Sequence, residues 1–138
     1  MSTWINILKD DPLPWLLEEN TPAVRHLTLR HLLDQPENAT DVRHASAAAM
    51  QTDPIASILA AQYPEGFWVK SGPGYAPKYR GTVWQVIFLD QLGADGRDMH
   101  VQAACEEARH GRFAVVRSDH GLGVFDHEEG RFAAGDTA

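Results

Sequence analysis

Six cationic and aromatic residues in the middle of the chain have the chemistry of a ligand-binding loop. Lysine and arginine hold anionic groups such as a diphosphate, while aromatic rings line an apolar or carbohydrate cavity. Gly72 and Gly74 lie among them and let the backbone approach a ligand closely. The predicted ligand-binding residues are Lys70, Tyr75, Lys78, Tyr79, Arg80 and Trp84. The same residue types can instead pin the loop to itself through cation–π contacts and hydrogen bonds.

Residue spacing assigns neither a catalytic group nor a metal ligand. Metal ligands on one helix are typically four residues apart, whereas His26 and His31 are five apart and point in different directions. His100 and Cys105 have the same unfavourable spacing. The acidic doublets at 10–11, 18–19, 106–107 and 128–129 stand where solvated helix ends or turns are expected. We therefore predict no catalytic residue, no metal site and no cofactor, and the sequence leaves open whether any reaction is catalysed.

A second motif, structural rather than chemical, precedes this loop. Gln62 follows an apolar helical run, Gly66 comes four residues later, and Trp68 two residues after that. A glutamine amide can bond to the unpaired groups at a helix end, and a glycine there permits the positive φ that reverses the chain. The tryptophan can then fold back over the junction. These three residues predict a clamp between two helices.

Helical signals run through most of the chain before residue 110. Thr21-Pro22 gives an N-cap and a proline at the first helical position, and leucines recur on one face up to Asp34. Further helices are expected after Thr40 or Asp41 and over 55–62, 80–92 and 99–109. The helix over 80–92 is apolar around most of its circumference, which predicts burial on several sides. After Gly111 the helical pattern ends, and two short segments, 113–116 and 122–125, are able to pair as a hairpin around residues 118–121.

The Gln-x-x-x-Gly-x-Trp spacing resembles the repeat of squalene-hopene cyclases, oxidosqualene cyclases and the related protein prenyltransferases. Ile58 and Leu59 occupy the aliphatic positions upstream of the glutamine. The stretch Gly-Pro-Gly-Tyr-Ala-Pro-Lys-Tyr-Arg-Gly-Thr-Val-Trp-Gln over 72–85 resembles uncharacterised bacterial members of this superfamily. The likeness runs from about Asp11 to Glu107. It implies α/α toroids built from helical hairpins.

The chain departs from that family in its chemistry and its length. It has no Asp-x-Asp-Asp motif, and Cys105 lies outside any Asp-Cys-Thr-Ala-Glu signature, so no cyclase catalytic residue carries over. The zinc ligands of the prenyltransferases have no match with suitable spacing. The chain also has too few helices to close a ring. We therefore expect self-association, or a longer polypeptide that completes the toroid.

Composition narrows the class of protein. The 138 residues, 43% of them hydrophobic, suffice for one core. A net charge of −7 disfavours nucleic acid and anionic lipid surfaces as partners. One cysteine and the lack of a signal-like or 18-residue apolar run predict a cytoplasmic protein without a membrane span.

These observations predict an all-α fold: helical hairpins of an incomplete α/α toroid, with an irregular or short β-hairpin tail. We expect a partial toroid domain over 1–110 and an irregular tail over 111–138. The first functional hypothesis is a non-cyclase member or fragment of the toroid family that binds an apolar or isoprenoid-type molecule at the aromatic and basic loop. The alternative is a HEAT-like helical-repeat interaction module, which the Pro-Ala-Val-Arg start at Pro22 resembles.

Overall fold

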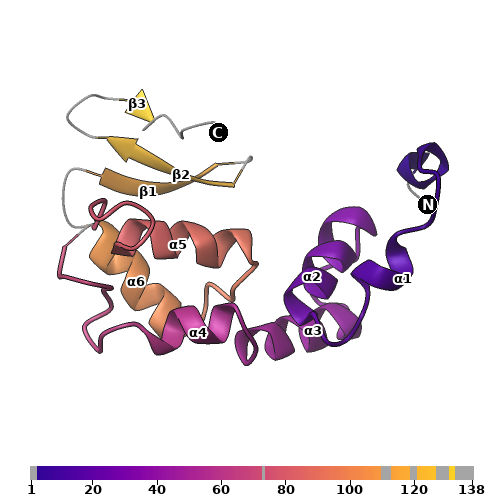
Figure 1. Ribbon diagram of the computed structural model, residues 1–138, viewed down its shortest axis with the longest axis horizontal. Helices are drawn as coiled ribbons and strands as arrows, with labels where there is room; N and C mark the ends of the chain where they lie inside the picture. The colour runs from indigo at the N-terminus through magenta and orange to yellow at the C-terminus, as the bar shows by residue number, and fades with distance from the viewer. Residues whose placement is uncertain (1–2, 73, 110–112, 119–120, 127–130, 133–138) are drawn as a thin grey trace. The chain divides into compact units, whose positions relative to one another are not determined.

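The computed structural model describes residues 3–72, 74–109, 113–118, 121–126 and 131–132, with the three strands described by their backbone. Helices dominate, as the sequence predicts (Figure 1). They are η1 (Thr3–Ile7), α1 (Leu13–Leu16), α2 (Pro22–Leu27), η2 (Thr28–Leu32), α3 (Thr40–Met50), α4 (Ile55–Ala60), α5 (Thr82–Gln91) and α6 (Met99–Arg109). None of them, in the part of the chain described, has the length and apolar character needed to cross a bilayer.

The chain packs as two compact units. One comprises Met1–Ser57 and Leu92–Ala94, and the other comprises Ile58–Gln91 and Asp95–Ala138. The boundary between Ser57 and Ile58 differs from the predicted division after residue 110. Contact units are not the same as independently folding domains, so the predicted limits of 1–110 and 111–138 stay a prediction.

In the first unit, α2 packs against α3. Leu29, Val42 and Ala45 form a buried cluster that Leu17 and Leu33 help to cover. Pro22 begins α2 as predicted, but the Thr21 side chain bonds to the carbonyl of Glu18 instead of capping the helix. The helix continues into one π turn, in which the amide of Leu33 donates to the carbonyl of Thr28 at 3.1 Å. α3 has Ala39 at its N-cap position and no side-chain cap bond, so the predicted cap at Thr40 or Asp41 is wrong.

In the second unit, α5 and α6 lie side by side. Gly93, at φ +74°, follows α5 as the predicted helix stop. The carboxylate of Asp98 accepts hydrogen bonds from the amides of His100 and Val101, which confirms the predicted cap of α6. The fully buried residues of α5, which include Val83, Val86 and Leu89, recur on one face, and the residues between them are half-buried. Burial of α5 is therefore less complete than predicted.

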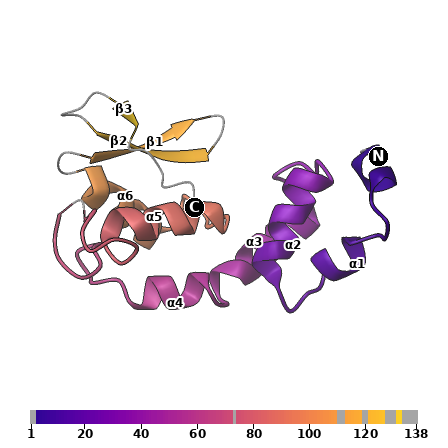
Figure 2. The ribbon, with the colours of Figure 1, turned by 45° about the horizontal axis from the view of Figure 1, so that its top comes forward.

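Three short strands follow α6: β1 (Phe113–Ser118), β2 (Gly121–Asp126) and β3 (Arg131–Phe132). β1 and β2 pair antiparallel with Phe113 opposite Asp126 and Ser118 opposite Gly121, which is the hairpin expected from the sequence. β3 adds to β2, so the tail is a three-stranded sheet in the order β1-β2-β3. Figures 1 and 2 both show the sheet beside α5 and α6, on the side opposite α4.

Candidate functional site

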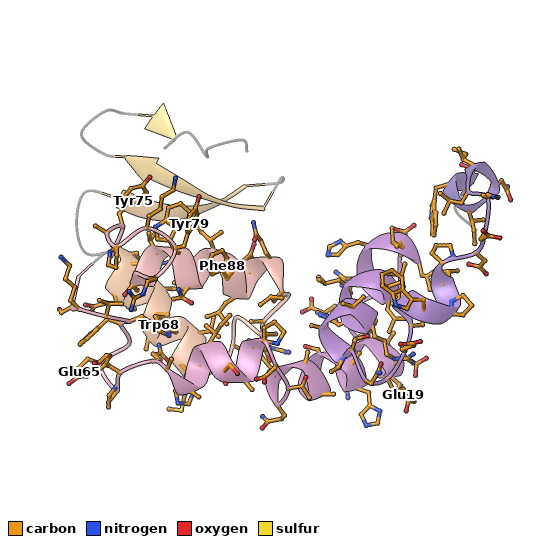
Figure 3. The ribbon with its side chains drawn as sticks, viewed as in Figure 1. Glu19, Glu65, Trp68, Tyr75, Tyr79 and Phe88 are labelled. Atoms are coloured by element: carbon orange, nitrogen blue, oxygen red, sulfur yellow. The ribbon has the colours of Figure 1, made fainter. Side chains whose placement is uncertain are left out.

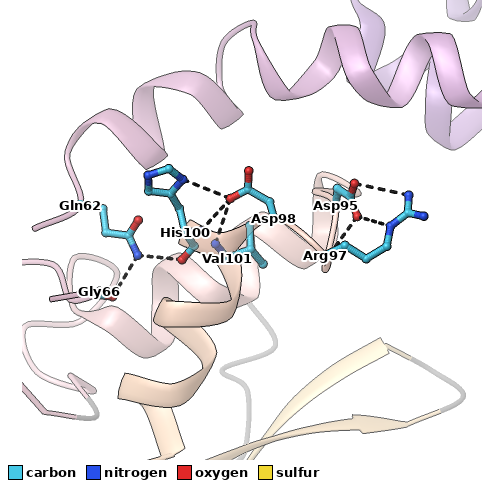
Figure 4. Close-up of polar contacts among 7 residues, drawn as sticks. All are labelled: Gln62, Gly66, Asp95, Arg97, Asp98, His100 and Val101. Atoms are coloured by element: carbon cyan, nitrogen blue, oxygen red, sulfur yellow. Dashed lines mark hydrogen bonds and ion pairs between the residues drawn. The ribbon is translucent and has the colours of Figure 1, made fainter. Parts of the chain in front are cut away.

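The Gln62, Gly66 and Trp68 motif joins three helices of the second unit. The Gln62 amide donates to the carbonyl of Gly66 at 3.1 Å and to the carbonyl of His100, in the first turn of α6, at 2.9 Å (Figure 4). Because His100 is 38 residues away in the sequence, this bond fixes the end of α4 against the start of α6. The side-chain oxygen of Gln62 is buried and has no hydrogen-bond partner.

Trp68 completes the clamp from the other direction. It exposes only 4% of its surface, and its indole N–H donates to the carbonyl of Ile58 in α4 at 2.8 Å. Its backbone amide donates to the hydroxyl of Thr82, the first residue of α5, at 3.1 Å. Thr82 is itself fully buried, and the sequence analysis did not identify this role. The only signal for it was a hydroxyl residue at the start of an apolar helix.

Gly66 has the backbone conformation that the clamp needs. Its φ is +103°, which residues with a side chain rarely adopt. A Cβ placed there would lie 2.8 Å from the carbonyl oxygen of Ala103 in α6. Glycine is therefore required both for the turn and for the close approach of α6.

Residues 74–81 form a closed loop directly before α5. Its two ends, Gly74 and Gly81, approach so closely that a Cβ on Gly81 would overlap the carbonyl of Gly74. Gly74 also lies against the backbone of Thr82, and its φ is +66°. Only glycine fits at either end. The base of the loop is thus closed by contact between two backbone segments.

Trp84 holds this loop from the first turn of α5. Its indole N–H donates to the carbonyl of Tyr75 at 2.9 Å, and its ring lies 5.4 Å from the ring of Tyr75. The ring of Tyr79 meets it edge-on at 4.8 Å. The side chain of Gln85 also donates to the carbonyl of Tyr79, at 3.0 Å. Figure 3 shows Tyr75 and Tyr79 at the end of α5, on the side opposite Trp68.

The tip of the loop is exposed. Tyr79 exposes 53% of its surface although its backbone has φ +65°, a conformation that costs a non-glycine residue about 1–2 kcal/mol. The Lys78 ammonium lies 5.0 Å from the centre of the Tyr79 ring, and the side chain of Arg80 is exposed. Five of the six predicted ligand-binding residues, Tyr75, Lys78, Tyr79, Arg80 and Trp84, thus belong to one cluster. Lys70 is exposed in the preceding segment and has no printed contact with that cluster.

The segment before the loop is held by a residue that the sequence analysis missed. One carboxylate oxygen of Glu107, in the last turn of α6, accepts a hydrogen bond from the Ser71 hydroxyl at 3.1 Å and one from the amide of Gly72 at 2.6 Å. The expectation that the 106–107 doublet is merely solvated is therefore wrong for Glu107. Val101, Ala104 and Ala108 form the buried face of α6, and Glu107 borders it. That position was the available signal.

The other candidate groups do not converge. In the part of the chain described, no three His, Cys, Asp or Glu side chains come close enough together to hold a metal ion. Burial raises the pKa of the Cys105 thiol, which keeps it protonated and weakly nucleophilic. Burial, and secondarily Arg30 and His31, lower the pKa of His26, so that its imidazole is neutral at pH 7. The Asp–His dipeptides at 119–120 and 126–127 lie outside the described residues, except for the backbone of Asp126.

Comparison of the chain with models of known protein families, with curated protein sequences and with solved structures finds no match. The toroid family therefore stays a prediction that rests on the clamp and loop motifs.

Proposed function

We propose that this protein binds a largely apolar molecule that carries an anionic group, such as an isoprenoid compound, at the loop formed by residues 74–81. The observation that carries this proposal is the contrast between the base and the tip of that loop. The base is fixed by the contact of Gly74 with Gly81 and by Trp84, whereas the tip keeps Lys78, Tyr79 and Arg80 at the surface.

A fixed loop with an exposed tip favours binding, because little conformational entropy is lost when a ligand docks on it. The positive φ of Tyr79 adds to this, since strained backbone persists where the surroundings enforce it and is frequent at functional sites. The cations suit an anionic group, and the rings of Tyr75, Tyr79 and Trp84 suit the apolar part.

The clamp supports a second part of the proposal, that the chain is a non-cyclase member or fragment of the cyclase and prenyltransferase toroid family. Gln62 and Trp68 link α4, α5 and α6 by side-chain to backbone bonds, which is the role that the family motif implies. The proposal extends to self-association, or to a longer polypeptide that completes the ring. It concerns binding, and it assigns no reaction to the protein.

The test is thermal unfolding of the full chain with farnesyl diphosphate, farnesol and inorganic diphosphate as separate probes. Farnesyl diphosphate should raise the melting temperature most, because it alone engages both the rings and the cations. A Lys78→Ala/Arg80→Ala variant should unfold at the temperature of the unmodified protein and lose this shift. Both side chains are exposed, so their removal leaves the core unchanged.

A Lys9→Ala/Arg43→Ala variant is the matched control, since it removes the same charge from two exposed positions of the first unit. It should keep the full shift. Equal shifts in the two variants, or no shift with any probe in the unmodified protein, would disprove the binding proposal.

A HEAT-like interaction module is the second candidate, and the packing of α2 against α3 around Leu29, Val42 and Ala45 favours it. Helical-repeat proteins are built from such pairs. This candidate predicts no response to any of the three small-molecule probes and a protein partner instead.

A further inference from the structure

The N-terminal stretch of the chain presents large apolar side chains to solvent. Neither η1 nor α1 contains a buried residue. Ile7 exposes 84% of its surface, Leu8 46% and Trp15 70%. Tryptophan is among the residue types most enriched at the energetic centres of protein interfaces, so a tryptophan this exposed points to a binding surface.

The stretch is nevertheless held in place by specific bonds. The indole of Trp4 in η1 donates to the carbonyl of Leu32 at 3.4 Å, and Arg25 in α2 donates to the carbonyl of Leu17 at 2.5 Å. The Asp11 carboxylate accepts a hydrogen bond from the amide of Leu13 and so caps α1. These bonds belong to the first unit and do not require burial of Trp15. We refer to Ile7, Leu8 and Trp15, with the acidic residues beside them, as the N-terminal surface.

The charge of this surface is negative. Residues 3–20 contain Asp10, Asp11, Glu18 and Glu19 against a single cation, Lys9, and all five are exposed. Glu18 lies one helical turn beyond Trp15, and its amide bonds to the Trp15 carbonyl. An apolar centre with an acidic rim suits a partner that offers rings or aliphatic groups next to lysine or arginine.

The loop of residues 74–81 has that chemistry. Between 69 and 81 the sequence contains Lys70, Lys78 and Arg80 and no acidic residue. The exposed ring of Tyr79 lies between two of these cations in the sequence. A guanidinium group also binds the face of an indole, which Trp15 offers.

We propose that the N-terminal surface of one copy of this protein binds the loop of residues 74–81 of a second copy. Two different surfaces meet in such a contact, so it is heterologous and joins copies head to tail into rings or open chains. The inference does not rest on ligand binding at the loop. If both occur, an anionic ligand competes with the second copy.

Paired charge reversal tests this contact. Variant A, Asp10→Lys/Glu18→Lys, makes the N-terminal surface basic, and variant B, Lys78→Glu/Arg80→Glu, makes the loop acidic. Each alone sets like charges against each other and should sediment as a monomer at concentrations where the unmodified protein associates. An equimolar mixture restores opposite charges at every contact, with A and B alternating, and should associate again.

The outcomes are decisive in both directions. Restored association in the mixture supports the contact. An unmodified protein that stays monomeric at high micromolar concentration, variants that associate as the unmodified protein does, or a mixture that stays monomeric would each overturn it. Because variant A keeps the loop unchanged, it should still bind farnesyl diphosphate, so failure of the head-to-tail contact can be told apart from failure of ligand binding.

Two further variants separate the contact from general charge effects. Glu65→Lys/Glu106→Lys changes the net charge as variant A does, at exposed positions of the second unit, and should leave association intact. Trp15→Ser should weaken association by about 30-fold or more if Trp15 lies at the centre of the interface. Circular dichroism should show the helical content of all variants unchanged, because every altered side chain is exposed.

Discussion

The clamp around Trp68 and the loop around Trp84 use the same residue types for different ends. In each, an indole N–H donates to a backbone carbonyl. The clamp adds the bond from Gln62 to His100, 38 residues away, whereas the bonds that hold the loop join residues six and nine apart. Trp68 is buried, and Tyr79 at the tip of the loop is exposed. The comparison suggests that the clamp stabilises the unit and that the loop, fixed by local bonds, is available for recognition.

The largest difference between the two regions is expected for their aromatic residues. Trp68→Ala should lower the free energy of unfolding by about 3–5 kcal/mol, because it opens a cavity and leaves the Ile58 carbonyl without its donor. Tyr79→Ala should lower it by about 1 kcal/mol or less, since only an edge-on ring contact is lost. Urea denaturation of both variants measures this. Comparable losses would mean that the loop is as structural as the clamp.

Two glycines with nearly the same backbone conformation give a smaller and more specific difference. Gly66 and Gly72 have φ of +103° and +106°, so alanine at either position incurs a conformational cost of about 1–2 kcal/mol. Only at Gly66 would the new Cβ meet a neighbour, the carbonyl of Ala103, while nothing lies within 4 Å at Gly72. Gly66→Ala should therefore be the more destabilising variant in thermal unfolding. Equal effects would show that α6 can move away from the clamp without cost.

The smallest expected effect concerns Glu107, which connects the segment before the loop to α6. Glu107→Gln weakens two bonds to a charged acceptor, so amide hydrogen exchange at Gly72 should accelerate about 10-fold while global stability changes little. Glu106→Gln is the matched control, because Glu106 pairs only with Arg109 within α6. Unchanged exchange at Gly72 in Glu107→Gln would mean that the glycine contacts alone fix this segment.

Local signals predicted much of the helical framework. Proline at the start of α2, aspartate at the cap of α6 and glycine after α5 act over one or two turns, so they are legible in the sequence. Gln62, Gly66 and Trp68 were also predicted as a unit, because their spacing is short. The cap at Thr40 or Asp41 was predicted wrongly, since hydroxyl and carboxylate side chains at helix starts have alternatives that spacing does not exclude.

The candidate site was predicted in composition and missed in detail. Aromatic and basic residues indicated the loop, yet nothing in their order indicated the contact of Gly74 with Gly81 or the positive φ of Tyr79. Thr82 and Glu107 were missed because their partners, Trp68 and the amide of Gly72, lie 14 and 35 residues away. A polar residue on the border of a buried helix face gives no indication of which distant backbone group it will meet.

The sequence by itself determined the helical class, the ends of several helices and the identity of the clamp, because helix periodicity, capping and chain reversal depend on residues within a few positions of one another. Only the tertiary structure decided that Trp84 closes a loop, that Glu107 restrains its approach and that Trp15 is exposed. These outcomes depend on which distant surfaces meet, and the same side chain is buried, bonded or exposed according to the neighbour that packing brings to it.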